Sequence, residues 1–537
     1  MLMRMSGVRD RRNVAVLLGA CSIWLGFPND LAFLPLVILL WPLSLAYIGF
    51  AAKSPAEAAR FGLTLNFLGI GATLYWLAYP IHQVGDLPWP LASLVALLVA
   101  LALALIYTFF PLVLYRAKNL SPVKVAFIAA VAWTLLEIVS GEPLDFPWIP
   151  LTGGLVLWPI LVQVAVYVGS TGTAFLWIFL LMLLVFPRGS KKALTFGLLV
   201  LALLLFVGAK RCLDHPKDAL PSGENSLGVL FVEGNFDQNE KWTPSLQRAT
   251  LDRYRTLTRT GLEKAPGPVS LIIWPETCMP FFLENSPILD SLIRESARES
   301  KRPLLFGVPG TDRERRIYNR AMLLDAKGAT LGYVDKEHLV PFGEYVPAFL
   351  DIPIFQSLLQ GVAYSKGTRT APLRVGAIAA GILICYEGIF PELAQKRTEE
   401  GANILVDLSN DAWFSRTPAP SQHLYLKALR CVEQNRWLLR GTNSGISAVI
   451  DHVGRIVFQG PLFTAESLYA RARLSQDTTF YHRTRDWQSI LFLFFCALAV
   501  VLLSPPFCHN SDRNTYGRIH SPSRRHSTGK SRSHSAL

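Results

Sequence analysis

The first 210 residues of the chain arrange their hydrophobic positions in long, nearly unbroken segments. Seven such segments lie at residues 13–27, 31–52, 61–80, 88–115, 124–140, 158–186 and 193–209, and an eighth lies at 490–503. A helix needs roughly 18–20 apolar residues to cross the hydrocarbon core of a bilayer, and several segments reach that length. The pattern therefore predicts a polytopic α-helical membrane bundle of about eight transmembrane helices.

Arginine and lysine occur in alternate loops between these segments. They lie in the N-terminal tail and then at Lys53 and Arg60, at Arg116, Lys118 and Lys124, and at Arg188, Lys191 and Lys192. The intervening loops, 28–30, 81–87 and 141–157, contain neither residue type. Loops rich in Lys and Arg stay on the cytoplasmic side of a membrane. We therefore expect both termini in the cytoplasm and the long segment after the seventh helix on the outer side.

Between about residues 220 and 480 the pattern changes to short apolar runs that alternate with amphipathic stretches. The runs at 228–232, 269–274, 303–307, 330–334, 378–385 and 403–407 predict strands, and the stretches 246–264, 286–300, 391–400 and 421–437 predict helices. Residues 445–458 predict further strand around a turn at 452–454. Strands interleaved with helices are typical of an α/β domain. We expect a membrane arm at 1–211, an outer α/β domain at 212–486, an eighth transmembrane helix at 487–508 and a basic tail at 509–537.

The composition agrees with a membrane protein and explains much of the positive charge. Hydrophobic residues make up 51% of the chain and charged residues only 17%, which is unusual for a soluble protein. Of the net charge of +13, the first twelve residues contribute +3 and the last 29 contribute +5. Basic ends beside membrane helices reflect membrane orientation, so we expect no nucleic-acid partner. The ten histidines lack Cys or His partners at zinc spacing, so we expect no metal and no cofactor.

Three predicted strands end on side chains suited to nucleophilic catalysis. Glu276 follows the run 269–274, Lys336 follows the run 330–334, and Cys385 ends the run 378–385. A thiol needs a base before it becomes a nucleophile, and a carboxylate with a pKa raised by burial can serve as one. A lysine can stabilise both the thiolate and a developing oxyanion. Each residue alone has an ordinary interpretation, as a cap, a solvated lysine or a buried thiol, but together they predict a catalytic triad.

The sequence around these residues resembles the carbon–nitrogen hydrolase (nitrilase) superfamily. The runs that carry the resemblance are Trp274-Pro-Glu-Thr, Lys336-Glu-His-Leu-Val-Pro-Phe-Gly-Glu-Tyr-Val-Pro, Cys385-Tyr-Glu and Leu408-Ser-Asn-Asp-Ala-Trp-Phe. With the loops Gly26-Phe-Pro and Phe146-Pro-Trp and the run Arg440-Gly-Thr-Asn-Ser-Gly, the chain resembles more closely the apolipoprotein N-acyltransferase family of bacterial inner-membrane enzymes. The resemblance covers nearly the whole chain and implies an αββα sandwich on a transmembrane bundle. Ser415 departs from the family, which commonly has Gly there, and the tail 509–537 has no counterpart in it.

The resemblance also implies a role for each position that matches a motif. Cys385 corresponds to the nucleophile that becomes acylated, Glu276 to the general base and Lys336 to the lysine that stabilises the oxyanion. The supporting positions of the active site are the second carboxylate, the two residues beside the nucleophile and an aromatic residue on the approach: Glu344, Tyr386, Glu387 and Trp242.

The implied reaction moves an acyl chain from a membrane phospholipid through a Cys385 thioester to the α-amino group of the lipidated N-terminal cysteine of an apolipoprotein. The implied partners are a phospholipid donor and a diacylglyceryl-modified apolipoprotein acceptor, at the periplasmic side of the inner membrane. Because both substrates are anchored in lipid, we expect the site to face the membrane. The apolar segment 346–362, with Phe355 and Leu358, predicts a mobile lid over the acyl site, and packing within the sandwich is the alternative.

Two other functions remain open at this point. A membrane-anchored amidase or nitrilase would use the same three residues with water as the acceptor, but it needs neither a seven-helix arm nor apolar segments near its site. A scaffold or receptor with an inactive hydrolase domain would not need all three chemical positions, and all three are intact.

Overall fold

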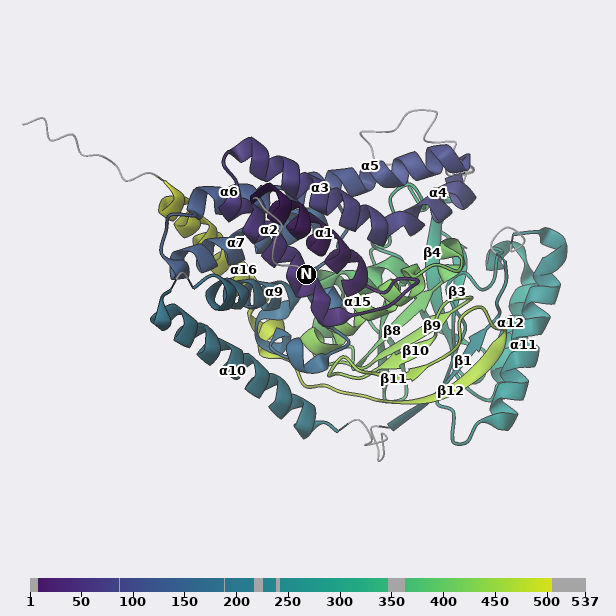
Figure 1. Ribbon diagram of the computed structural model, residues 1–537. Helices are drawn as coiled ribbons and strands as arrows, with labels where there is room; N and C mark the ends of the chain where they lie inside the picture. The colour runs from purple at the N-terminus through teal and green to yellow at the C-terminus, as the bar shows by residue number, and fades with distance from the viewer. Residues whose placement is uncertain are drawn as a thin grey trace, which may run out of the picture.

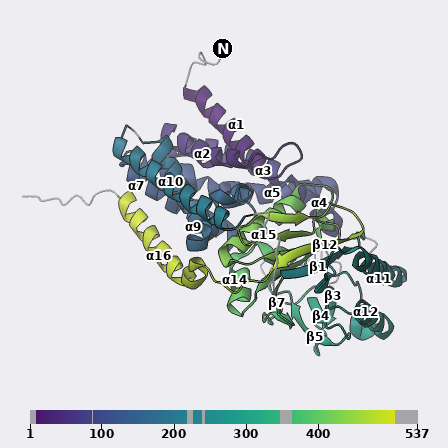
Figure 2. The ribbon, with the colours of Figure 1, turned by 90° about the horizontal axis from the view of Figure 1, so that it is seen from below.

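A bundle of long helices lies against a domain built on two β-sheets (Figure 1, Figure 2). The computed structural model describes residues 8–85, 87–187, 189–216, 226–237, 242–345 and 363–504. The bundle consists of α1 (Val8–Gly26), α2 (Leu40–Ala51), α3 (Pro55–Leu74), α4 (Ala78–Gly85), α5 (Trp89–Tyr107), α6 (Phe109–Ala117), α7 (Pro122–Gly141), α8 (Leu151–Leu155), α9 (Ala165–Val185), α10 (Lys191–Asp214) and α16 (Phe480–Leu503).

Six helical stretches within the described residues are long and apolar enough to cross a membrane, compared with the eight expected. They are Pro55–Gln83, Trp89–Ala117, Pro122–Gly141, Ala165–Val185, Lys191–Asp214 and Phe480–Leu503. The other two expected segments are also helical, but the first turns of α1 contain the charged residues 9–12 and Pro35–Ala51 is a shorter apolar helix. The expected segment 158–186 forms a long helix only from Ala165, because Pro159 opens a separate 3₁₀ turn, and inside that helix Gly169 has a non-helical φ of 69°.

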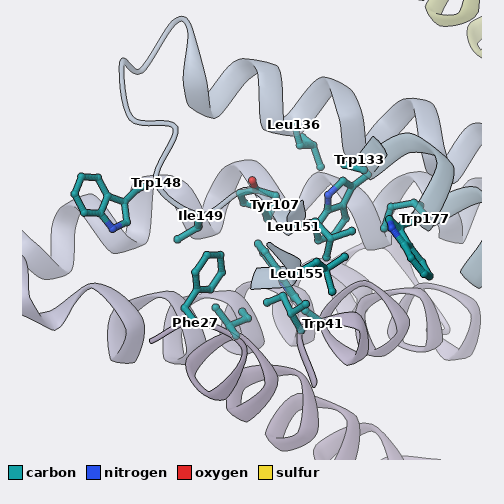
Figure 3. Packing of buried hydrophobic residues seen from close by; sticks show 14 of the residues in the cluster. Phe27, Trp41, Tyr107, Trp133, Leu136, Trp148, Ile149, Leu151, Leu155 and Trp177 are labelled. Atoms are coloured by element: carbon teal, nitrogen blue, oxygen red, sulfur yellow. The ribbon is translucent and has the colours of Figure 1, made fainter. Parts of the chain in front are cut away.

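The outward surface of the bundle agrees with a lipid environment. On α10 and α16, a set of large apolar side chains is more than half exposed: Leu199, Leu203, Phe206, Phe494 and Val501. Contiguous apolar surface of this kind is unstable in water and stable in hydrocarbon. Inside the bundle, Trp41, Tyr107 and Trp133 pack from three different helices, with ring centroids 4.7–5.4 Å apart (Figure 3).

Hydroxyl side chains cap the N-termini of three bundle helices. Ser54 accepts a hydrogen bond from the backbone N–H of Glu57 at 3.2 Å, and Pro55 fills the first helical position of α3. Ser190 and Thr479 cap α10 and α16 in the same way. A side-chain oxygen at this position satisfies a backbone donor that the helix itself leaves unpaired, which sets the start of each helix.

Two six-stranded sheets are present within the described residues, in the orders β12-β1-β2-β3-β4-β5 and β11-β10-β9-β8-β7-β6. The strands of the first sheet are β1 (Ser226–Glu233), β2 (Leu271–Ile273), β3 (Leu304–Thr311), β4 (Ile317–Leu324), β5 (Thr330–Asp335) and β12 (Glu466–Arg473). Those of the second are β6 (Leu373–Val375), β7 (Ile378–Ile384), β8 (Ile404–Ser409), β9 (Leu438–Thr442), β10 (Ala448–Ile450) and β11 (Ile456–Gln459). Strands β1, β2 and β3 run parallel, as do β7, β8 and β9.

Helices cover the outer face of each sheet, so the fold is the predicted αββα sandwich. They are α11 (Gln247–Lys264) and α12 (Pro287–Ser300) on the first sheet, and α14 (Pro391–Glu399) and α15 (Ala419–Gln434) on the second. In β7, Ile382 and Ile384 enter the core between the sheets, whereas Leu383 joins the core that α14 and α15 share with the membrane bundle. Alternate residues of a strand point to opposite faces, so a continuously apolar strand can serve both cores.

Gln422 on α15 forms a polar connection between the sandwich and the bundle. Its side-chain oxygen accepts hydrogen bonds from the indole N–H groups of Trp76 at 3.0 Å and Trp148 at 2.8 Å. Its amide donates to the carbonyl oxygens of Pro28 at 2.8 Å and Thr73 at 3.3 Å. One buried side chain therefore joins three separate segments of the arm to the helix that lies behind the second sheet.

We expect Gln422→Met to destabilise this connection. Methionine has a similar length but cannot pair with the buried indole and carbonyl groups, and each buried group left unsatisfied costs about 1–3 kcal/mol. The thermal unfolding midpoint of the chain in detergent should fall clearly. The control is Gln459→Met on an exposed position of β11, which should leave the midpoint unchanged. Equal midpoints for the two variants would contradict this role of Gln422.

Candidate active site

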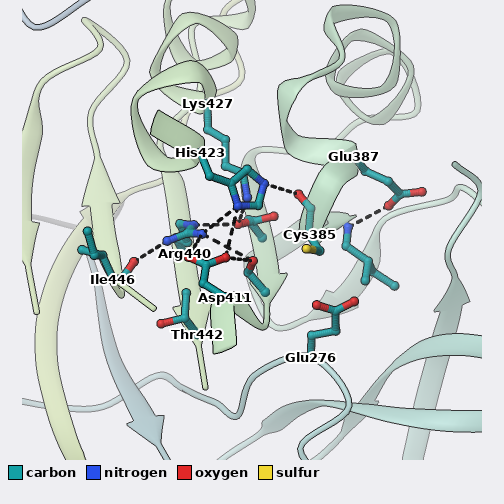
Figure 4. A network of polar contacts seen from close by, with 12 residues as sticks. Glu276, Cys385, Glu387, Asp411, His423, Lys427, Arg440, Thr442 and Ile446 are labelled. Carbon is teal, nitrogen blue, oxygen red and sulfur yellow. Dashed lines mark hydrogen bonds and ion pairs between the residues drawn. The ribbon is translucent and has the colours of Figure 1, made fainter. Parts of the chain in front are cut away.

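The three side chains predicted for catalysis meet at one end of the sandwich. Glu276 follows β2, Lys336 follows β5, and Cys385 follows β7 as the first residue of the 3₁₀ turn η8 (Cys385–Ile389). The Lys336 Nζ atom lies 3.7 Å from Glu276 Oε1, and the charges of both groups act on the Cys385 thiol. In Figure 4 the Glu276 carboxyl group lies on the thiol side of Cys385. In α/β folds the functional side chains commonly lie just after the ends of strands, because the loops there bring together residues that are far apart in the sequence.

Cys385 lies on a strained turn that Glu387 holds in place. The φ of Cys385 is 57°, in the left-handed region that few residues other than glycine adopt. The carboxylate of Glu387 accepts hydrogen bonds from the backbone N–H of Ile384 at 2.7 Å, of Glu337 at 2.7 Å and of His338 at 3.0 Å. A single buried carboxylate thus ties the Cys385 turn to the backbone that follows Lys336. Burial raises the pKa of Glu387.

Lys336 is fully surrounded by protein and is paired with two carboxylates. Its Nζ atom donates to Glu344 Oε1 at 3.0 Å, in addition to the contact with Glu276. Burial lowers the pKa of the amine, but the negative charges of Glu344 and Glu276 outweigh that effect and raise the pKa overall. Lys336 therefore carries its positive charge at neutral pH, as a group that stabilises an oxyanion must.

Asn319 is a part of this cluster that the sequence did not indicate. Its side-chain amide donates to Glu276 Oε1 at 2.7 Å and to Glu344 Oε1 at 3.0 Å, and its backbone carbonyl oxygen accepts from the backbone N–H of Lys336 at 2.8 Å. Asn319 lies in β4, a strand that was not predicted because Asn319 and Arg320 interrupt its apolar pattern. The adjacent polar residues Asn319 and Arg320 within a short apolar run were the only sequence feature that could have indicated a site residue here, and such a pair is weak evidence.

The environment of Cys385 keeps its sulfur protonated at neutral pH. Burial raises the pKa of the thiol, and the negative charge of Glu276 raises it further, to about 12, although Lys336 and Lys427 act in the opposite direction. A thiol with this pKa is almost entirely protonated at neutral pH. Nucleophilic attack therefore requires a base close to the sulfur, and Glu276 occupies that position.

A second network of charged groups lies behind Cys385, on the side facing α15 (Figure 4). Arg440 donates to Asp411 at 2.7 Å and to Asp407 at 3.1 Å, and Lys427 forms an ion pair with Asp407 at 2.5 Å. His423 lies within this network, where burial and the charge of Lys427 lower its pKa to about 4. Its imidazole is therefore neutral. The sequence motifs included Asp411 and Arg440 without a role for them, and His423 was only one of the ten histidines that lack partners at zinc spacing.

The supporting residues predicted from sequence differ in where they lie. Tyr386 donates from its hydroxyl group to the backbone carbonyl of Asp145 at 2.6 Å, so it connects the nucleophile turn to a loop of the membrane arm. Trp242 is 40% exposed in the turn before η4 (Pro244–Leu246). Phe355, Leu358 and the rest of the predicted lid, 346–362, lie outside the described residues.

Ser415, where the resemblance leads us to expect Gly, ends the 3₁₀ turn η9 (Asp411–Phe414) with a φ of 52°. Glycine adopts this conformation without strain, which explains the preference at this position.

Among the described residues, no group of three or more His, Cys, Asp or Glu side chains could hold a metal ion.

Comparison with known proteins identifies both parts of the chain. The family model described as carbon-nitrogen hydrolase matches residues 241–479, and the model described as apolipoprotein N-acyltransferase N-terminal domain matches residues 19–183. The sandwich with its Glu, Lys and Cys at the strand ends is therefore a carbon–nitrogen hydrolase domain, attached here to a membrane arm.

Relatives that share both parts give the family of the whole chain. The apolipoprotein N-acyltransferase of Geobacter metallireducens is 33% identical over 468 residues, which cover 82% of this chain and 87% of that protein. The apolipoprotein N-acyltransferase of Azotobacter vinelandii is 33% identical over 500 residues, which cover 86% of this chain and 90% of that protein. The chain belongs to the apolipoprotein N-acyltransferase family.

Proposed function

We propose that this protein transfers an acyl chain from a membrane phospholipid, through a thioester on Cys385, to the α-amino group of a diacylglyceryl-modified N-terminal cysteine of an apolipoprotein. The observation that carries the proposal is the convergence of Glu276, Lys336 and Cys385 at one end of a sandwich whose helix α15 packs against a membrane bundle. Membership of the apolipoprotein N-acyltransferase family supports the transferase over a hydrolase that uses water.

In the first half-reaction, the carboxylate of Glu276 removes the proton from the Cys385 thiol, and the sulfur attacks the carbonyl carbon of a phospholipid ester. The developing oxyanion is stabilised by Lys336 Nζ and by the backbone N–H of Tyr386. The carbon–sulfur bond forms, the ester carbon–oxygen bond breaks, and Glu276 returns its proton to the leaving oxygen. The products are a lysophospholipid and the acyl-enzyme.

In the second half-reaction, the free α-amine of the acceptor attacks the thioester carbon. Glu276, again a carboxylate, accepts a proton from the amine, and the same two donors stabilise the second oxyanion. The carbon–nitrogen bond forms as the carbon–sulfur bond breaks, and the proton on Glu276 passes to the Cys385 thiolate. The enzyme returns to its starting state and the product is an amide.

We also propose that the catalytic domain lies on the periplasmic side of the inner membrane, with both termini in the cytoplasm. Two contacts gather basic segments at one end of the bundle: Arg12 forms an ion pair with Glu57, and Tyr115 donates to the carbonyl of Lys53 at 3.3 Å. The loops that contact Gln422 of the sandwich lie at the other ends of these helices. Basic residues concentrate on the cytoplasmic side, so the opposite end is the periplasmic one.

The proposal is tested by incubating the purified full-length chain with a phospholipid that carries a radiolabelled acyl chain. We expect label on the peptide that contains Cys385, sensitive to hydroxylamine as a thioester is, and transfer of that label to a synthetic diacylglyceryl peptide. Release of the label as free fatty acid in the presence of the peptide would identify a hydrolase. An unlabelled Cys385 in a folded preparation would remove the acyl-enzyme from the mechanism.

A further inference from the structure

His423 contacts the backbone of the nucleophile rather than its side chain. Its Nε2 atom lies 3.2 Å from the carbonyl oxygen of Cys385, and its Nδ1 atom lies 3.2 Å from Nη2 of Arg440 (Figure 4). The carbonyl oxygen can only accept a hydrogen bond, and the guanidinium can only donate one. Nδ1 also lies 3.2 Å from Oδ1 of Asp411, and that contact alone would favour a proton on Nδ1. A proton on Nε2 suits both the Cys385 carbonyl and the Arg440 guanidinium, whereas a proton on Nδ1 would suit Asp411 only, so we assign the imidazole proton to Nε2.

The carbonyl of Cys385 belongs to the same peptide unit as the N–H of Tyr386. A trans peptide is planar, and its C=O and N–H bonds point in opposite directions. A donor that fixes the carbonyl oxygen on the α15 side therefore aims the Tyr386 N–H away from α15. A hydrogen bond to the carbonyl also polarises the peptide and strengthens its N–H as a donor. The orientation of this peptide needs a donor to hold it, because Cys385 has a strained φ of 57° and the turn has other conformations of lower local energy.

The imidazole is itself held on several sides. The ring of Trp148, from the membrane arm, stacks on it with a centroid distance of 5.5 Å and an interplanar angle of 23°. The preceding residue in the chain is Gln422, which binds Trp148 and other groups of the arm. His423 is only 1% exposed, so it cannot reach solvent or a lipid substrate directly. The arm and the nucleophile turn thus meet at the first turns of α15.

We propose that His423 is a positioning residue for acyl transfer: its Nε2–H holds the Cys385 carbonyl so that the Tyr386 N–H points at the developing oxyanion. The inference deepens the proposed function and rests on its acyl-enzyme step. It assigns a role to a buried polar group that takes no part in the proton transfers.

The test compares three substitutions. In His423→Gln the side-chain amide puts an N–H near the position of Nε2. In His423→Phe the ring can still stack on Trp148 but has no donor, and in His423→Asn the amide is too short to reach the carbonyl. Each variant is acylated with p-nitrophenyl butyrate, whose attack by sulfur generates an oxyanion, and alkylated at Cys385 with iodoacetamide, whose substitution generates none.

We expect ester acylation to fall about 10- to 100-fold in the Phe and Asn variants, because loss of one oxyanion donor costs about 10²–10³ in rate and misalignment costs a part of that. The Gln variant should stay within about threefold of the parent chain. Alkylation should be nearly unchanged in all three variants. The loss should appear in kcat and not in KM, because His423 does not contact the acyl donor.

Equal losses in acylation and alkylation would overturn the proposal, since they would show general damage to the turn. A Gln variant as slow as the Phe and Asn variants would also overturn it. Because the activated ester replaces the phospholipid, this comparison reads out the role of His423 even if the chain fails to use a phospholipid donor. Failure of the proposed function and failure of this inference are therefore distinguishable.

Discussion

Replacement of Glu276 by Gln slows acylation of Cys385 by about 10²- to 10⁴-fold, the range expected for loss of a general base. The glutamine can still accept the hydrogen bond from Asn319, so the local packing is largely retained. What is lost is the group that removes a proton from a thiol whose pKa is raised to about 12. The measurement is the rate at which label from phospholipid appears on Cys385.

The pH dependence of the Glu276→Gln variant provides a second measurement. Without a base, the rate follows the fraction of thiolate, which rises about tenfold for each pH unit below the pKa of the thiol. Removing the negative charge of Glu276 lowers that pKa, but burial still holds it up, so we expect the steep rise to persist between pH 7 and 9. The parent chain should change much less over this range because its carboxylate already serves as the base.

The matched control is Glu314→Gln, which neutralises an exposed glutamate in an ion pair with Arg316. It should leave both the acylation rate and its pH profile unchanged. If the Glu276→Gln variant were acylated at the parental rate at pH 7, another group would have to be the base.

Replacement of Lys336 by Met strongly slows acylation of Cys385 and also destabilises the folded chain. Lys336 is 1% exposed and lies between Glu276 and Glu344. Removing the cation leaves two buried carboxylates close together without compensation, which costs about 3–5 kcal/mol for a buried pair. The loss of oxyanion stabilisation adds a rate decrease of about 10²–10³-fold. Thermal unfolding in detergent and the acylation rate measure the two effects.

A second substitution separates stability from catalysis in this prediction. In the double variant Lys336→Met with Glu344→Gln, one of the two negative charges is removed, so part of the lost stability should return. Acylation should remain as slow as in the single variant, because the cation is still absent from the site. Recovery of activity together with stability would show that Lys336 serves the fold alone.

Much of the sandwich was predictable because its secondary structure follows local patterns. Predicted helices such as 246–264 and 286–300 agree closely with α11 and α12, whose amphipathic periods are evident in the sequence. The apolar runs ending near Trp274 and Cys385 were also recognised as strands. By contrast, β4 and β12 escaped prediction because Asn319, Arg320 and Arg471 interrupt their apolar patterns, and such strands are stabilised by neighbours in the sheet rather than by their own sequence.

The number of membrane helices was harder to predict than their positions. Hydropathy predicted eight segments, and six of them meet the requirements of length and apolarity in the described residues. Runs of apolar residues do not reveal whether a helix is interrupted, as at Gly169, where the backbone leaves the helical conformation for one residue. The side chain of Tyr481 fills the space beside this glycine. The interruption therefore lies where α9 packs against the start of α16.

The sequence alone determined the chemical identity of the site: a thiol, a carboxylate and an amine, each placed just after an apolar strand. It could do so because the ends of neighbouring strands meet at one edge of a sandwich whatever the loops between them are. The tertiary structure decided which groups orient those three. Asn319 pairs with Glu276 across 43 positions of sequence, and Gln422 binds Trp76 across 346. No local pattern marks such residues, since an asparagine, a glutamine or the histidine beside it gains its role only from the neighbours that folding supplies.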